Sequence, residues 1–182
     1  MNQLPTAVFL DRDGTLIEDE HYLSRPEQVR LVDGAAEAVA RINSALIPVI
    51  VVTNQSGIAR GILTEADHER VTARLNELLA ARGAHLDASY HCPHAPEDAC
   101  ECRKPGTLLY RQAAAANHAV NLSRSLYIGD RFRDVEPALT LGGHGVLVPS
   151  RETPAYEIQA ATARARVAPS LATALDWFLC SN

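Results

Sequence analysis

The stretch "AVFLDRDGT" (residues 7–15) decides the fold class, because an apolar run ends there in two carboxylates and a glycine. Similar β-branched runs follow at 47–53, 125–130 and 145–149, with a weaker one at 86–91. Helical patterns separate or follow these runs at 34–45, 64–82, 107–120, 134–141 and 170–179. Short strands that alternate with helices predict an α/β fold, a Rossmann-like doubly wound parallel sheet with three layers (α/β/α).

Length and composition are those of a globular protein with a single domain over residues 1–182. A net charge of -5 provides no broad basic surface, so we expect no nucleic-acid partner. No apolar run approaches the roughly 18 residues of a membrane span, and the N-terminus lacks the pattern of a secretory signal. We therefore expect a cytoplasmic monomer with free thiols and no membrane partner.

Polar side chains stand where the predicted strands end. Asp11, Thr53 and Asp130 close three of the apolar runs, and the basic pair Arg103–Lys104 follows a cysteine cluster. An aspartate after a strand is commonly a turn residue or a helix cap. However, the carboxyl ends of parallel strands meet at one edge of a sheet, where ligands bind, so the combination favours an active site.

The chemistry of such a site follows from "DRDGT". Asp11 and Asp13 can converge on one divalent cation if the chain turns at Gly14, and Mg²⁺ prefers oxygen ligands. One carboxylate can then attack phosphorus while the other transfers protons. Lys104 and Thr53 can neutralise or hydrogen-bond the phosphoryl oxygens as charge develops.

Four motifs carry a family resemblance. "FLDRDGTL" (9–16), "VVTNQSGIARG" (51–61), "CRKP" (102–105) and "GDRFRD" (129–134) resemble the motifs of the haloacid dehalogenase superfamily of phosphatases, in the same order. Together with "CPH…CEC" (92–102), they resemble more narrowly the D,D-heptose 1,7-bisphosphate phosphatases and their histidinol-phosphatase relatives. The resemblance covers about residues 5 to 150.

The resemblance implies a catalytic role for five residues. Asp11 matches the nucleophile that becomes an aspartyl-phosphate, and Asp13 matches the acid that protonates the leaving alcohol and then activates water. Thr53 and Lys104 match the groups that hold the phosphoryl oxygens, and Arg103 matches a substrate-recognition position. The implied Mg²⁺ ligands are Asp11, Asp130 and the backbone carbonyl of Asp13.

The resemblance also implies a substrate-facing rim. Arg131 stands where relatives often have lysine, and Asp134 either supports Lys104 or the metal ligands, or is an exposed acid at a helix start. The expected substrate-binding residues come from the loops around the phosphate: Arg12, Asp19, Glu20, His21, Tyr22, Asn54, Gln55, Ser56 and Arg131.

The cysteine cluster predicts a zinc-binding loop at 92–102 within the domain. A disulfide is disfavoured in the cytoplasm, where clustered cysteine and histidine more often bind metal. Three thiolates and one imidazole form a closed set that suits a structural zinc and leaves no position for water. We expect this loop to hold Arg103 and Lys104 in the site, with His91 as the competing imidazole. The predicted ligands are Cys92, His94, Cys100 and Cys102.

The expected function is a Mg²⁺-dependent phosphatase that hydrolyses the C7 phosphate of D-glycero-D-manno-heptose 1,7-bisphosphate, a phosphorylated sugar. Arg103, Arg131 and Arg60 could meet a second phosphate, whereas Asp19 and Glu20 could serve the ammonium of histidinol phosphate. The alternatives are therefore a histidinol-phosphate phosphatase or another phosphatase of small esters.

Three other classes of protein share parts of the pattern. A zinc-dependent nucleic-acid-binding module would explain the cysteines, but not the carboxylates at the strand ends or the acidic balance. A phospho-acceptor signalling module would need neither Asp13 as a proton donor nor a zinc loop. A phosphomutase normally needs a cap that excludes water, and residues 14–46 leave room only for a loop and one helix. We therefore expect no large cap domain.

Overall fold

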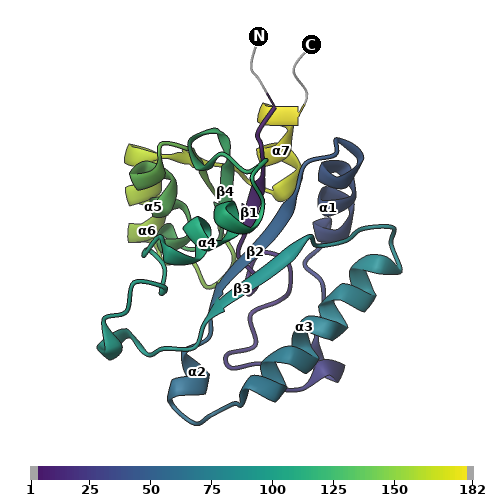
Figure 1. Ribbon diagram of the computed structural model, residues 1–182, viewed down its shortest axis with the longest axis vertical. Coiled ribbons are helices and arrows are strands. Elements are labelled where there is room, and N and C mark those ends of the chain that lie inside the picture. The colour runs from purple at the N-terminus through teal and green to yellow at the C-terminus, as the bar shows by residue number, and fades with distance from the viewer. Residues whose placement is uncertain (1–3, 180–182) are drawn as a thin grey trace.

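The computed structural model describes residues 4–179 and shows one parallel sheet with helices on both faces (Figure 1). The strand order is β3-β2-β1-β4-β5-β6, and every neighbouring pair is parallel. This order confirms the predicted doubly wound fold, and its direction reverses at β1, which places a ligand crevice between β1 and β4. The strands are β1 (Val8–Leu10), β2 (Val49–Asn54), β3 (Ala88–Cys92), β4 (Leu126–Gly129), β5 (His144–Leu147) and β6 (Arg166–Val167).

The helices follow the predicted pattern with shifted ends. The helix expected at 107–120 stops at residue 116, and the one expected at 134–141 begins at residue 132. Two helices and one strand, α2, α6 and β6, have no counterpart in the prediction. α2 and β6 are too short to show a period, and the apolar residues of α6 are mostly alanine. The helices are α1 (Ala35–Ser44), α2 (Ser56–Ala59), α3 (Glu65–Ala80), α4 (Leu108–Ala116), α5 (Phe132–Leu141), α6 (Ala155–Arg164) and α7 (Leu171–Leu179), with 3-10 turns at Pro26–Gln28, Pro96–Asp98 and Leu122–Arg124.

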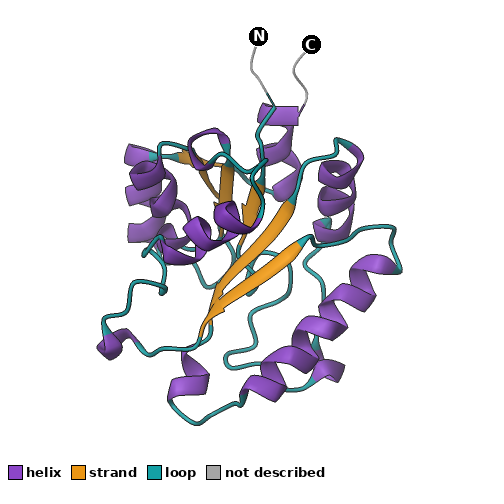
Figure 2. Cartoon of the chain, viewed as in Figure 1, coloured by secondary structure: helices purple, strands orange, loops and turns teal. Residues whose placement is uncertain are grey.

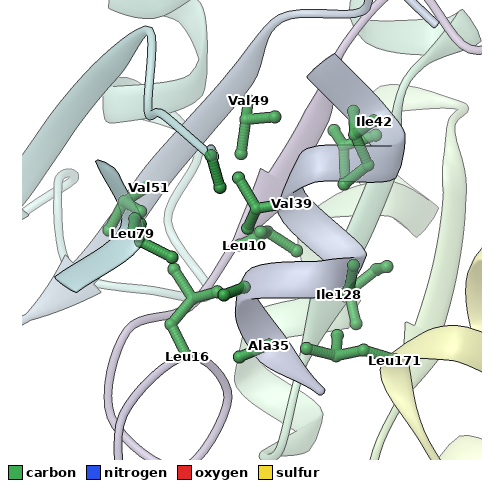
Figure 3. Close-up of a cluster of buried hydrophobic side chains, with 14 of the residues drawn as sticks. Leu10, Leu16, Ala35, Val39, Ile42, Val49, Val51, Leu79, Ile128 and Leu171 are labelled. Carbon is green, nitrogen blue, oxygen red and sulfur yellow. The ribbon is translucent and has the colours of Figure 1, made fainter. Parts of the chain in front are cut away.

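The central strands are buried on both faces, as the apolar runs require. On one face, Leu10 and Val49 pack against Val39 and Ile42 of α1, in a core that α3 and α7 complete (Figure 3). On the other face, the Phe9 ring lies 5.1 Å from that of Tyr110 on α4. The sheet is therefore a rigid platform whose carboxyl edge lies at the bottom of Figure 1, where α2 follows β2.

The N-terminus of α3 is fixed by a capping box. The Thr64 hydroxyl accepts a hydrogen bond from the Asp67 amide at 3.1 Å, and the Asp67 carboxylate accepts one from the Thr64 amide at 2.8 Å. Such a cap contributes about 1 kcal/mol and fixes where the helix begins. It thereby sets the position of His68 in the first turn, which reaches the candidate site.

The segment between β1 and α1 is a loop with a single 3-10 turn and two isolated bridges, Asp13 to Ile17 and Ile17 to Leu31 (Figure 2). As expected, residues 11–48, between β1 and β2, contain no large cap domain. Within residues 4–179, none of the helices is long and apolar enough to cross a membrane.

Candidate active site

The Lys104 ammonium lies at the centre of the carboxyl edge of the sheet. It donates hydrogen bonds to Asp11 Oδ1 and to the Val52 carbonyl, both at 2.7 Å, and forms an ion pair with Asp134 Oδ1 at 2.8 Å. Burial alone would lower the pKa of Lys104, but the charges of Asp11 and Asp134 overcome that effect and raise it. Lys104 is therefore a fixed positive charge, and Asp134 is a buried support for it rather than an exposed acid.

Three buried carboxylates surround this ammonium. Asp11, Asp130 and Asp134 each bring an oxygen within 4.8 Å of the other two. Burial and the charge of Asp134, opposed by Lys104, raise the pKa of Asp11 to about 6, and burial with the charges of Asp11 and Asp134 raises that of Asp130 to about 7. One ammonium does not balance three carboxylates, so the cluster fits a divalent cation such as Mg²⁺, which relieves the repulsion.

The Asp130 carboxylate is held by residues after β5. The Ser150 hydroxyl donates to its Oδ2 at 2.7 Å, and the Thr153 hydroxyl donates to its backbone carbonyl at 2.7 Å. Gly14 leaves the space that this carboxylate occupies, because a Cβ there would lie 2.4 Å from Asp130 Oδ2. Gly14 also has φ +78°, so the turn between Asp13 and the following loop requires glycine on two grounds.

Asp13 is held at the mouth of the site. The Arg12 guanidinium contacts both of its oxygens, at 3.0 Å to Oδ2, and the Gln55 amide donates to Oδ2 at 2.8 Å. The same Gln55 nitrogen lies 2.9 Å from the Thr53 hydroxyl, so one amide ties the end of β2 to the loop after β1.

Arg12 was predicted to bind substrate, and the structure places it behind Asp13. Its side chain is 2% exposed, and its second terminal nitrogen donates to His68 Nδ1 at 3.1 Å. Burial and the charge of Arg12 lower the pKa of His68 to about 3, which keeps the ring neutral and able to accept this bond. The described contacts of Arg12 thus position Asp13.

Two adjoining hollows form the site. The inner one, of about 30 Å³, is lined by the predicted magnesium ligands and by the predicted catalytic residues other than Arg103. The outer one, of about 330 Å³, is lined by most of the predicted rim. Neither is lined by Glu20 or Arg103; the Arg103 guanidinium instead donates to the His94 carbonyl at 3.2 Å. The inner lining is Asp11, Asp13, Asp19, Thr53, Asn54, Lys104, Asp130, Arg131 and Arg133, and the outer lining is Arg12, Asp13, Asp19, His21, Tyr22, Leu23, Asn54, Gln55, Ser56 and Arg133.

The predicted zinc ligands converge on one point. The three pairs of sulfur atoms lie 3.1 to 3.5 Å apart, and His94 Nδ1 lies 3.2 Å from Cys102 Sγ and 3.7 Å from Cys92 Sγ. The edge of a tetrahedron of ligands about 2.3 Å from a zinc ion is about 3.8 Å, so the group fits Zn²⁺ with a slight expansion. His91, the competing imidazole, instead lies 2.8 Å from Glu65 Oε2 and against the His68 ring.

The cysteine loop is joined to the catalytic edge by backbone pairing. In the β2–β3 ladder, Asn54 is opposite Cys92, and the backbone N–H of Gln55 donates a hydrogen bond to the Cys92 carbonyl at 2.7 Å. The Asn54 side chain in turn accepts from the Lys104 amide at 2.9 Å and donates to its carbonyl at 3.2 Å. The residues on either side of the loop therefore position Lys104. The chain's fourth cysteine, Cys180, lies outside the described residues.

Several residues of the site were not predicted from the sequence. Ser150 and Thr153 follow a predicted strand, and the strand-end rule used for Asp11 could have found them. Arg133 lies inside "GDRFRD", where only Arg131 and the two aspartates were considered. His68 had no such signal, because it lies on the buried stripe of an amphipathic helix, where a histidine is usually part of the core.

Comparison with known proteins identifies relatives over most of the chain. The family model for polynucleotide kinase 3 phosphatase matches residues 6–137, and the HAD-hydrolase-like model matches residues 101–174. The chain is 33% identical to the D-glycero-beta-D-manno-heptose-1,7-bisphosphate 7-phosphatase of Escherichia coli (strain K12), over 96% of this chain and 88% of that protein. It is 38% identical to the Pseudomonas aeruginosa protein of the same name, over 79% and 80% of the two chains.

A solved structure agrees with these relatives. The crystal structure of D,D-heptose 1.7-bisphosphate phosphatase from B. bronchiseptica, complexed with magnesium and phosphate, superposes with a TM-score of 0.86. Its sequence is 31% identical, and the match covers 96% of this chain and 98% of that one.

The raised carboxylate pKa values predict that the acid cluster destabilises the metal-free fold at neutral pH. Asp11 and Asp130 have pKa values of about 6 and about 7 in the folded protein, above the value near 4 in the unfolded chain. The protons that they bind therefore stabilise the folded state fully below about pH 4. This stabilisation is lost as the pH rises through 6 and 7. In a chelator at pH 8, we expect Asp130→Asn to raise the free energy of unfolding by on the order of 2 kcal/mol.

The measurement is denaturant unfolding between pH 4 and pH 8. Asparagine keeps an acceptor for the Ser150 hydroxyl, so the difference from the wild type should vanish near pH 4. Asp33→Asn, at an exposed acid, is the control and should show no such pH dependence. A variant less stable than the wild type at pH 8 would contradict repulsion within the cluster.

Proposed function

Because the chain belongs to the D-glycero-D-manno-heptose 1,7-bisphosphate 7-phosphatase family of haloacid dehalogenase-like phosphatases, we propose that it hydrolyses the C7 phosphate of that bisphosphate. The observation that carries the proposal is the buried Lys104 ammonium held between Asp11 and Asp134 at the carboxyl edge of the sheet. It provides a positive charge beside a nucleophile, as phosphoryl transfer needs.

In the first step, the Asp11 carboxylate attacks phosphorus and the bond from phosphorus to the C7 oxygen breaks. Lys104 contacts Asp11 Oδ1, so Oδ2 is the oxygen that we assign to the attack. Asp13 gives its proton to the leaving C7 oxygen, and the Arg12 and Gln55 contacts hold it toward the mouth where that oxygen lies.

In the second step, the Asp13 carboxylate takes a proton from water, which attacks the aspartyl-phosphate. The bond from phosphorus to the Asp11 oxygen breaks, and inorganic phosphate leaves. Lys104 and the Thr53 hydroxyl neutralise or hydrogen-bond the phosphoryl oxygens in both steps. We assign Mg²⁺ to Asp11, Asp130 and the Asp13 carbonyl; when bound, it offsets the charge of these acids and of the phosphate.

We assign Zn²⁺ to Cys92, His94, Cys100 and Cys102 as a structural ion. The donor set is closed, so the ion has no position for substrate. Its proposed role is to hold the chain that leads into Lys104. Thiolates stay available for metal in a reducing compartment, which supports a cytoplasmic location.

The substrate is tested by kinetics of the purified protein with Mg²⁺. We expect kcat/KM for the heptose bisphosphate to exceed that for histidinol phosphate by on the order of 10²-fold, because each cation that meets a second phosphate adds a charged hydrogen bond. A preference for histidinol phosphate would assign the acidic Asp19 to its ammonium group and overturn the proposed substrate.

Removal of the nucleophile tests the mechanism. Asp11→Asn keeps the shape of the side chain but removes the attacking charge, so we expect turnover to fall on the order of 10³-fold or more. Phosphate release is the readout, and Asp33→Asn should retain wild-type turnover. Near-normal release by Asp11→Asn would exclude the aspartyl-phosphate.

Removal of a thiolate tests the structural metal. Metal analysis should find about one zinc per wild-type chain and little in Cys100→Ala. Activity should fall by about 10²-fold, because a displacement of Lys104 by about 1 Å misplaces its charge. His91→Gln is the matched control: it should keep its zinc, since His91 pairs with Glu65. Wild-type kinetics in a zinc-free protein would refute the positioning role.

A further inference from the structure

The inner and outer hollows share one wall. Asp13, Asp19, Asn54 and Arg133 line both, so a ligand whose phosphoryl group lies against Asp11 extends past these four side chains into the outer hollow. Asp13 is held by Arg12 and Gln55, and the Asp19 carboxylate accepts a hydrogen bond from the His21 amide at 3.1 Å. Within residues 4–179, Arg133 is the cation common to the two linings.

The arginines expected from the sequence to meet a second phosphate are engaged elsewhere. The Arg131 guanidinium donates to Glu157 Oε1, at 3.0 Å from its Nε. Arg103 donates to the His94 carbonyl and lines neither hollow. Arg60 donates to the Tyr22 hydroxyl at 2.7 Å.

Arg133 lacks such a bond. Its Nε is buried and has no hydrogen-bond partner among the described residues. Burial alone would raise the pKa of Glu157, but hydrogen bonds from Arg131 and the Phe132 amide, with a smaller effect of the Arg133 charge, lower it. The Glu157 oxygens accept these bonds, the one from the Phe132 amide at 2.6 Å. A buried donor left unpaired is unfavourable, so Arg133 gains from an acceptor that the described part of the chain does not provide.

We propose that Arg133 binds the phosphate that is not transferred, at the far end of a bisphosphate substrate, and so selects bisphosphates over monophosphates. This inference rests on the proposed function and adds a residue to it. Guanidinium groups bind phosphate through paired, charge-assisted hydrogen bonds, which suits an arginine that lines both hollows. The partly buried position of Arg133 strengthens such bonds relative to those of an arginine in open water.

The test compares two substrates that differ only in the second phosphate: the heptose 1,7-bisphosphate and the heptose 7-phosphate. For Arg133→Met, we expect kcat/KM for the bisphosphate to fall on the order of 10- to 100-fold, mainly through KM, because one charged contact is lost. The loss for the 7-phosphate should be at least about 5-fold smaller, so the preference for the bisphosphate shrinks. Arg133→Lys keeps the charge without the paired geometry, so its kcat/KM for the bisphosphate should lie between that of the wild type and that of Arg133→Met.

Two further variants serve as comparisons. Arg151→Met removes an exposed arginine outside both hollows and should retain wild-type values for both substrates. Arg131→Met should reduce kcat/KM for both substrates to a similar degree. Arg131 lines the inner hollow but not the outer one, so it lies near the phosphate that both substrates share. Thermal unfolding checks that each variant folds, and the lysine variant tests the proposal should the methionine variant be unstable.

The possible failures are distinguishable. If the wild type prefers histidinol phosphate to the bisphosphate, the proposed substrate fails, and the inference fails with it. If the wild type hydrolyses the bisphosphate but does not prefer it over the 7-phosphate, the inference alone is overturned. If the wild type has that preference but Arg133→Met reduces kcat/KM equally for both substrates, or for neither, the inference alone is overturned. A selective loss in Arg131→Met instead would also overturn it and give the role to Arg131.

Discussion

The site depends on one buried ammonium among carboxylates. Lys104 neutralises part of the charge of Asp11 and Asp134. Without it, three buried carboxylates would lie close together with no positive charge between them. Removing one partner of a buried ion pair leaves an uncompensated charge, which costs about 3–5 kcal/mol. The same ammonium anchors a loop distant in sequence to the ends of β1 and β2, so the charge balance of the site and the path of the chain are set together.

The parallel sheet makes this charge arrangement possible. Asp11, Thr53 and Asp130 come from three adjacent strands whose carboxyl ends meet at one edge. Helices bury both faces of these strands, so the edge is held in place by the core. The acids remain close together because the fold stabilises them there, at the expense of stability in the absence of a cation.

Much of this was predictable because it follows from local rules. Apolar runs predicted β1 to β5 but not β6, the strand-end rule predicted Asp11, Thr53 and Asp130, and ligand chemistry predicted the four residues of the cysteine cluster. Contacts between distant segments were not predictable in this way. The pairing of Arg12 with His68 depends on how α3 packs against the loop after β1. The pairing of Arg131 with Glu157 depends on α6, a helix that was not predicted. For that reason the sequence suggested Arg131 as a free cation, whereas the structure leaves Arg133 with the unpaired donor.

The register of β3 against β2 has a consequence for partial unfolding. β3 is an edge strand, and strands at an edge open more readily than those inside a sheet. Its last residue, Cys92, is opposite Asn54, the residue that holds the Lys104 backbone. Fraying of this one strand end would therefore loosen the backbone anchor of the catalytic lysine, while its ammonium stayed bonded to Asp11 and Asp134 and the core around β1 and β4 stayed folded. A metal on the cysteine loop would fasten that end, so its effect on catalysis would come from suppressing a local opening that a global measure of stability scarcely detects.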